Sequence, residues 1–81
     1  MKATVKVRLK NGILDPQGLT VKNALVHLGF KNMKNVRIGK LIELEIENTS
    51  PDEATKIIEA ACNKLLANPV IEDYIYEISE E

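Results

Sequence analysis

The sequence has few of the residue types on which catalysis and metal binding most often depend. Its 81 residues include one cysteine, Cys62, one histidine, His27, and no tryptophan. A single cysteine excludes an internal disulfide and a structural zinc site made from this chain's thiolates. A catalytic Cys62 would need His27 as its base, and a lone histidine is more typical of a surface position. We therefore expect no catalytic and no metal-binding residue in this chain.

Aromatic residues and excess positive charge are also scarce. Phe30, Tyr74 and Tyr76 are the only aromatic residues that could stack on bases, and the net charge of −1 gives no general attraction to phosphate. The apolar runs are too short to span a bilayer, and the chain opens on an alternating segment instead of the apolar core of a secretory signal. We expect a single cytoplasmic domain, residues 1–81, that binds neither nucleic acid nor membrane.

The chain is short enough for its stability to be marginal. A domain of about 80 residues buries only roughly 60% of the surface that its unfolded chain exposes. The composition, 44% hydrophobic and 28% charged, is that of a soluble globular domain. Association with a partner would add the buried surface that such a chain lacks.

The first third of the chain is typical of a strand followed by a helix. Residues 3–9 alternate between apolar and polar types, which is the period of a half-buried strand. Asp15 is the predicted helix cap, with Pro16 in the first turn and Thr20 as an alternative cap. The apolar positions with helical spacing are Val21, Ala24, Leu25 and Leu28. Gly29 suits the left-handed residue that ends a helix, so we predict one helix with a core-facing stripe.

Residues 35–47 favour one long strand. Five of their apolar residues fall on even positions on both sides of Gly39, namely Val36, Ile38, Ile42, Leu44 and Ile46. A two-residue hairpin at Gly39 and Lys40 would put the two halves on opposite faces. A three-residue turn ending at Leu41, or a long strand bent at Gly39, keeps them together, and we favour the strand. Thirteen residues span roughly 40 Å, more than the roughly 30 Å diameter of such a domain. We therefore predict a homodimer that shares or exchanges this strand.

Two rows of opposite charge would pair with each other if the first and second strands are neighbours. The basic row is Lys6, Arg8 and Lys10, and the acidic row is Glu43, Glu45 and Glu47. Cross-strand pairs between them would set the register and leave no phosphate-binding stripe.

The remainder of the chain predicts a second helix and a last strand. Ser50 and Glu53 form a capping box around Pro51. The predicted buried stripe is Ala54, Ile57, Ile58, Ala61 and Leu65, with Cys62 and Leu66 beside it. Pro69 stops the helix, with Asn68 as its cap, before a strand over residues 70–78. The expected fold is α+β, a small antiparallel sheet with two helices on one face and a long second strand.

Four blocks resemble the PurS family, the small subunit of phosphoribosylformylglycinamidine (FGAM) synthase. They are residues 14–18 (Leu-Asp-Pro-Gln-Gly), 28–30 (Leu-Gly-Phe), 36–40 (Val-Arg-Ile-Gly-Lys) and 62–74, which include Leu-Leu-Ala-Asn-Pro-Val-Ile-Glu. The match spans essentially the whole chain. The resemblance implies a ferredoxin-like, PurS-like fold and a place in a three-part ligase of de novo purine biosynthesis.

The resemblance implies a complex with two further subunits. A glutaminase (PurQ-like) subunit releases ammonia, and a large synthetase (PurL-like) subunit activates the substrate amide with ATP and Mg. The resemblance also implies that this chain supplies no catalytic residue and binds no cofactor. Its implied role is to hold the glutaminase on the synthetase so that ammonia passes between them. A homodimer or a dimer of dimers is expected.

The predicted docking residues share positions at turns, caps or strand bends. They are Asp15, Gln17, Gly18, Arg37, Gly39, Lys40 and Asn68. Capping and turn geometry explain Asp15, Gly18, Gly39 and Asn68 equally well. The predicted dimer interface is Ile38, Leu41, Ile42, Leu44, Tyr74 and Tyr76. The alternative functions are a ferredoxin-like module that senses an amino acid and a purely structural homo-oligomer.

Overall fold

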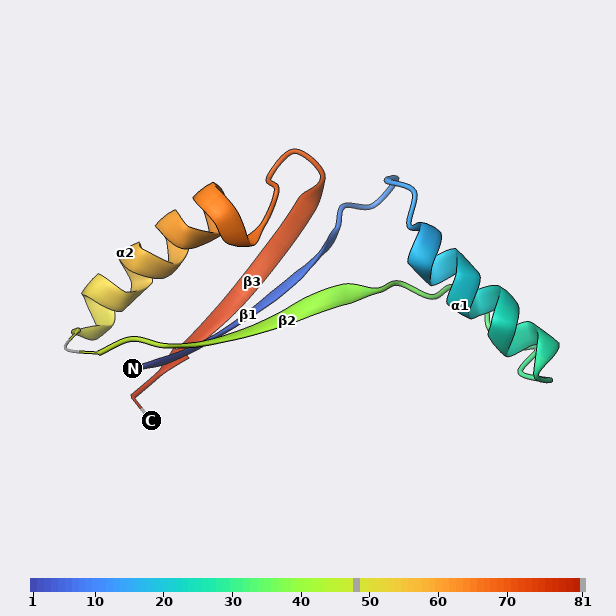
Figure 1. Cartoon of the computed structure of the whole chain (residues 1–81), viewed down its shortest axis with the longest axis horizontal. Helices are drawn as coiled ribbons and strands as arrows, with labels where there is room; N and C mark the ends of the chain where they lie inside the picture. The colour runs from blue at the N-terminus through green and yellow to red at the C-terminus, as the bar shows by residue number, and fades with distance from the viewer. Residues whose placement is uncertain (48, 81) are drawn as a thin grey trace.

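The computed structural model describes residues 1–47 and 49–80, which form a three-stranded sheet and two helices (Figure 1). The elements are β1 Lys2–Leu9, α1 Pro16–His27, β2 Gly39–Glu45, α2 Pro51–Ala61, the π-helical turn η1 Cys62–Leu66 and β3 Glu72–Ser79. β1 is the central strand, and β2 and β3 pair with it antiparallel on either side. The predicted α+β class is confirmed. In the described part of the chain neither helix is long and apolar enough to cross a membrane.

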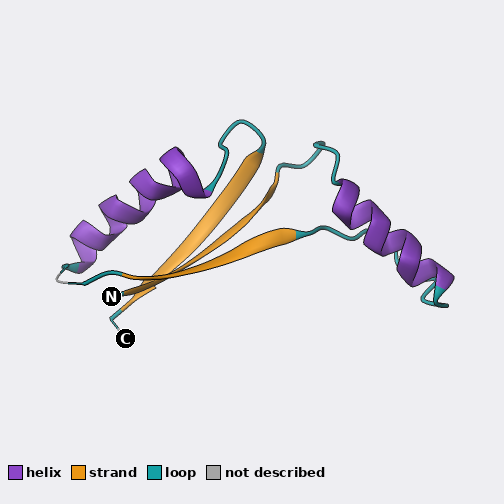
Figure 2. Ribbon diagram, in the orientation of Figure 1, coloured by secondary structure: helices purple, strands orange, loops and turns teal. Residues whose placement is uncertain are grey.

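The sheet, α2 and η1 together form the body of the protein (Figure 2). Val5 and Val7 of β1 pack with Ile58 and Cys62 in its core, and all four side chains are almost completely buried. Helix α2 begins at the predicted capping box, in which Ser50 Oγ accepts a hydrogen bond from the backbone N–H three residues later, at 3.2 Å. The second half of the chain thus builds its own core on β1.

The end of α2 differs from the predicted helix because it widens into η1. The Ala67 N–H donates to the Cys62 carbonyl oxygen at 3.0 Å, a bond that spans five residues instead of four. Such a turn rotates the following side chains relative to a regular helix. Leu65, predicted in the stripe, is 82% exposed. Before this turn the buried face already differs from the predicted one: Cys62, four residues after Ile58, lies at its centre and not beside it, and Ile57 is 45% exposed.

Helix α1 lies beyond the end of the sheet, on an arm that we define as residues 10–38 (Figure 1). The expected placement of both helices on one face therefore holds for α2 and not for α1. Only Gly18 of this helix is buried. The arm makes the molecule 50 Å long and gives it a radius of gyration of 16.2 Å, whereas a compact domain of this length would have about 12 Å.

Strand β2 is shorter than the strand predicted over residues 35–47. Its pairing with β1 begins where Gly39 lies opposite Arg8, and β1 ends one residue later. Residues 35–38 come from the arm and have no segment of the body to pair with. There is accordingly no hairpin at Gly39 and Lys40, and the long-strand interpretation holds only for the part that β1 can reach.

The register between β1 and β2 differs from the predicted charge pairing. Glu43 lies opposite Thr4 and Glu45 opposite Lys2, while Lys10 forms its ion pair with Asp73 at 3.8 Å. The buried face sets this register, because Val5 must lie opposite Ile42 and Ala3 opposite Leu44 to share one core. Exposed ion pairs contribute too little free energy to shift it.

Candidate functional site

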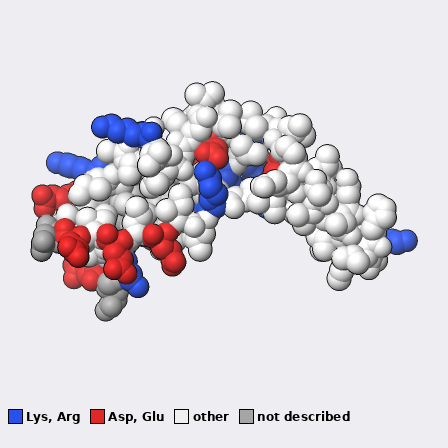
Figure 3. Space-filling model, viewed as in Figure 1, with Lys and Arg blue, Asp and Glu red and all other residues white. Residues whose placement is uncertain are grey.

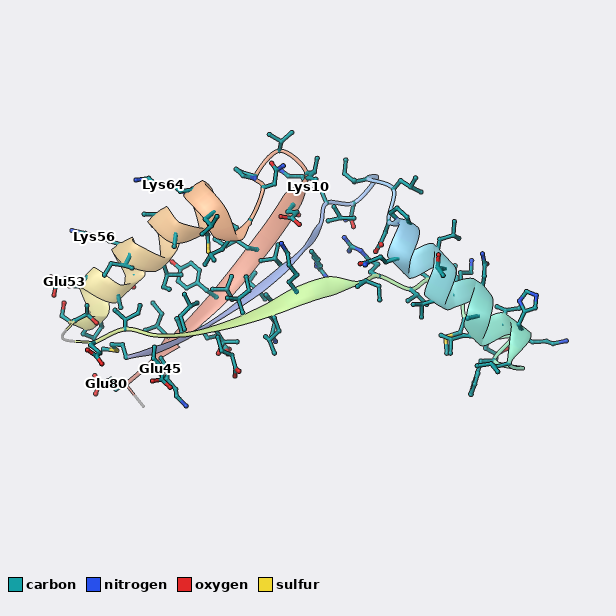
Figure 4. The ribbon with its side chains drawn as sticks, viewed as in Figure 1. Lys10, Glu45, Glu53, Lys56, Lys64 and Glu80 are labelled. Atoms are coloured by element: carbon teal, nitrogen blue, oxygen red, sulfur yellow. The ribbon has the colours of Figure 1, made fainter. Side chains whose placement is uncertain are left out.

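The predicted docking residues meet where the arm joins the body. We call this region the junction; it comprises the end of β1, the start of α1 and residues 36–40. Six of the seven predicted docking residues lie in it. The seventh, Asn68, is linked to it through Glu72, whose Oε1 accepts the Asn68 N–H at 2.7 Å while its Oε2 lies 3.8 Å from Lys40 Nζ. The Lys10 side chain, with its partner Asp73, marks the body side of the junction (Figure 4).

The Asp15 carboxylate connects the two segments of the arm. Its Oδ1 accepts the Gly18 N–H at 2.8 Å and caps α1, and its Oδ2 accepts the Ile38 N–H at 2.9 Å. These two bonds, that of Ile38 first, together with the nearby Arg37 guanidinium, hold the pKa of Asp15 below its ordinary value. Thr20, the alternative cap, lies inside the helix and donates to the Pro16 carbonyl oxygen instead.

Two glycines allow the segments of the junction to approach closely. A Cβ added at Gly18 would collide with the Val36 carbonyl oxygen and lie 2.8 Å from Asp15 Oδ2. A Cβ at Gly39 would lie 2.5 Å from the Val7 carbonyl oxygen. Both glycines therefore have structural roles, whatever partner the junction binds.

Arg37 has a role within the chain that its sequence context did not reveal. Its Nη2 donates to the Leu9 carbonyl oxygen at the end of β1, and its side chain is half-buried. Gln17 is exposed, and the Lys40 side chain is 59% exposed despite its ion pair. These two side chains are the ones that the junction presents most openly to a partner.

Glu72 is a junction residue that the sequence analysis missed. Its side chain is only 16% exposed because it lies between Lys40 and the turn at Asn68. The Asn68 carbonyl oxygen also accepts the N–H of Ile71 and of Glu72, so Asn68 shapes this turn while Ala67 caps the helical segment. Only its position at the end of the Asn-Pro-Val-Ile-Glu block could have drawn attention to Glu72.

The predicted dimer-interface residues are divided between two faces of the sheet. Ile42, Leu44, Tyr74 and Tyr76 lie on the face of α2, where they are half-buried against the core. Leu41 lies on the opposite, open face, 63% exposed and across Lys6 from Ile75, which is 67% exposed. Ile38 belongs to the arm and borders a shallow hollow with Val21.

The interactions that the junction offers are hydrogen bonds and ion pairs. Its side chains supply hydrogen-bond donors, cations and carboxylates that already have partners. Among residues 1–47 and 49–80 no group of three or more His, Cys, Asp or Glu residues could hold a metal ion. Cys62 lies in the body core, where burial raises the pKa of its thiol.

Comparisons with known proteins agree on one family. The family model "PurS: Phosphoribosylformylglycinamidine (FGAM) synthase" matches residues 2–80. The PurS subunit of Methanocaldococcus jannaschii FGAM synthase is 43% identical over 79 residues, 98% of this chain and 95% of that protein. The crystal structure of Bacillus subtilis PurS superposes with a TM-score of 0.88 and 47% identity, over 98% of each chain. A chain of the Thermotoga maritima PurLQS structure gives 0.84 and 34%, over 94% of this chain and 93% of that one.

The match is nearly complete in both directions, so it covers the body, the junction and the arm. The comparisons do not favour the amino-acid-sensing alternative, because the relatives and structures are PurS proteins. The chain therefore belongs to the PurS family and is a small subunit of phosphoribosylformylglycinamidine synthase.

Proposed function

We propose that this chain couples the other two subunits of FGAM synthase, holding the glutaminase on the synthetase so that ammonia passes between their active sites. The observation that carries the proposal is its likeness, over 94% of its length, to a chain of the Thermotoga maritima PurLQS structure. Free ammonia would be protonated in neutral water and lose its nucleophilicity. A subunit that closes the gap and excludes water therefore contributes to the rate without catalytic residues of its own.

The proposed docking surface is the junction. Gln17 and Lys40 are its exposed side chains, and Arg37 is held between the body and the arm. In this proposal ATP and Mg bind to the synthetase and not to this chain, and the complex works in the cytoplasm.

The proposed assembly of the chain itself is a homodimer, or a dimer of dimers, in which two copies exchange arms. Helix α1 leaves Val21 and Leu28 exposed at 38% and 74% although they lie on its predicted core-facing stripe. In this arrangement residues 35–38 of one copy extend along the free edge of β2 in the other copy. Helix α1 of the first copy then covers the half-buried Ile42 of the second. The exchange would bury the arm and restore a compact domain.

Charge favours the same arrangement. Residues 16–42 contain five Lys or Arg residues and no Asp or Glu. Acidic side chains gather at the end of the body away from α1 (Figure 3), where Glu45, Glu53 and Glu80 lie (Figure 4). Two copies aligned in opposite directions would bring a basic arm to each acidic end.

The experiment is a reconstitution with purified glutaminase and synthetase subunits, ATP and formylglycinamide ribonucleotide. Turnover is assayed with glutamine and, separately, with ammonium, each with and without this chain. We expect the chain to be required only with glutamine. Equal glutamine-dependent turnover without it would overturn the coupling role.

The same assay tests the docking surface. Arg37→Ala should weaken glutamine-dependent turnover and leave the ammonium-dependent reaction and the dimer intact. Wild-type levels of both activities would show that Arg37 is not a docking residue.

A further inference from the structure

The arm leaves the body through one segment, residues 10–15, and returns to it through another, residues 35–38. Asp15 ends the first of these segments and accepts a hydrogen bond from Ile38 in the second. With its other oxygen it caps α1 at Gly18. One side chain at the end of the first segment therefore bonds both to the second segment and to the helix that the arm carries.

The geometry requires a carboxylate at this position. Both partners of Asp15 are backbone N–H donors, and a carboxylate has an acceptor oxygen for each of them. An asparagine of the same shape has a single acceptor oxygen, so its NH₂ group would have to face one of the two N–H groups. Asp15→Asn can keep the cap on α1 only by giving up the bond to Ile38.

Two further contacts hold these segments together; we call the set of contacts made by Asp15, Gly18 and Arg37 the joint. Gly18 lets the first turn of α1 lie directly against the Val36 carbonyl oxygen. Arg37, next to Ile38, is bonded to the Leu9 carbonyl oxygen at the end of β1. The arm is thus fixed to the last residue of the central strand as well as to itself.

We propose that Asp15 is a positioning residue for the glutamine-dependent reaction: by bonding both Gly18 and Ile38 it sets the direction of α1 relative to residues 35–38, which lead directly into β2. The proposal rests on the coupling function proposed above. Asp15 acts through the arm, whose α1 stripe and junction side chains must be presented at one angle for subunits to assemble on them. Weakening the joint leaves the body folded and lets α1 adopt other angles. Assembly of the complex then requires a higher concentration of this chain.

The first test is amide hydrogen exchange of Asp15→Asn and of Asp52→Asn, the matched control. Asp52 lies in the first turn of α2, so this control removes one negative charge from the start of the other helix. We expect the Ile38 amide to exchange at least about tenfold faster in Asp15→Asn, as expected for the loss of a charge-assisted hydrogen bond, while the Val5 amide is unchanged. An unchanged Ile38 amide would overturn the proposal.

The second test is a titration of each variant in the reconstituted complex. The concentration of Asp15→Asn that gives half-maximal glutamine-dependent turnover should rise about tenfold, in line with the same lost bond, and turnover at saturating variant should return to the wild-type value. A lowered plateau with an unchanged midpoint, or a wild-type titration despite faster Ile38 exchange, would overturn the positioning role.

Gly18→Ala perturbs the same contacts without removing the carboxylate, because the added Cβ would collide with the Val36 carbonyl oxygen and lie 2.8 Å from Asp15 Oδ2. It should raise the same midpoint. A shift with Gly18→Ala alone would assign the positioning to the close backbone contact and not to Asp15. The wild-type chain tests the coupling function separately. If the glutamine-dependent reaction does not need this chain, turnover will not change as wild-type chain is added. Hydrogen exchange of the Ile38 amide would still report on the contacts of Asp15.

Discussion

The two helices of this chain begin alike and end in different surroundings. Both have a polar cap, Asp15 or Ser50, followed by a proline in the first turn. Helix α2 buries Ile58 completely in the body core, whereas the equally apolar Leu28 at the end of α1 is 74% exposed. A good cap and an apolar stripe therefore define a helix and do not decide which surface it covers.

The difference divides the molecule into a body that has its own core and an arm in whose helix only Gly18 is buried. The body needs no second chain to bury Val5, Val7 and Cys62. The arm is held in shape by the hydrogen bonds of Asp15 and Arg37 and by the bonds that cap the two ends of α1. At its C-terminal end the Phe30 N–H donates to the Leu25 carbonyl oxygen, and Gly29 has a φ of 105°. Substitutions in the body should affect folding, and those in the arm should affect assembly.

The largest effect is expected in the body core. Ile58→Ala should lower the free energy of unfolding by about 2 to 5 kcal/mol, because it leaves a cavity at a fully buried position. Urea denaturation measures this loss. Ile57→Ala, one residue earlier and 45% exposed, is the matched control. Equal losses for the two variants would show that α2 is not packed as described.

The next effect is expected in the arm. Leu28→Ser should weaken self-association at least about tenfold, because it removes an apolar side chain that the second copy would bury. The urea concentration at which the body unfolds should stay unchanged. Sedimentation equilibrium measures the association, with Asn23→Ala, an exposed substitution on the same helix, as its control. Unaltered association would contradict the exchange of arms.

A smaller effect is expected at the start of α2. Ser50→Ala removes the side chain that accepts the Glu53 N–H and should cost about 1 kcal/mol of body stability. Thr55→Ala, which removes only an exposed hydrogen bond to the Pro51 carbonyl oxygen and leaves the cap in place, should stay within about 0.5 kcal/mol. A Ser50 variant as stable as the Thr55 variant would show that the capping box contributes nothing.

The smallest effect is expected from acid. Bonding to Ile38 and Gly18 lowers the pKa of Asp15 in the folded chain, so the stabilisation of the joint is complete above the ordinary carboxyl pKa of about 3.9. It is lost as the pH falls through the lower, folded value. Carboxyl NMR should find Asp15 titrating below the ordinary carboxyl pKa, together with a shift of the Ile38 amide. Titration at or above the ordinary value would contradict the two bonds.

The predictable features are those that depend on a few neighbouring residues. The caps at Asp15 and Ser50, the end of α1 at Gly29 and the alternation of β1 are all local. The charge pairing between strands could not be predicted, because burial of Val5 against its neighbours outweighs exposed ion pairs. The π-helical turn was missed because a helical repeat of 3.6 residues was assumed through Cys62.

By itself the sequence determined the order of strands and helices, both helix caps, the end of α1 at Gly29 and the resemblance to PurS, since these depend on residue types and short spacings. Only the tertiary structure decided that α1 leaves the sheet, that Asp15 meets Ile38 and that Lys40 meets Glu72. These contacts join residues more than twenty positions apart. They depend on the strand order β2-β1-β3, which local spacing does not encode, and on how far β1 extends.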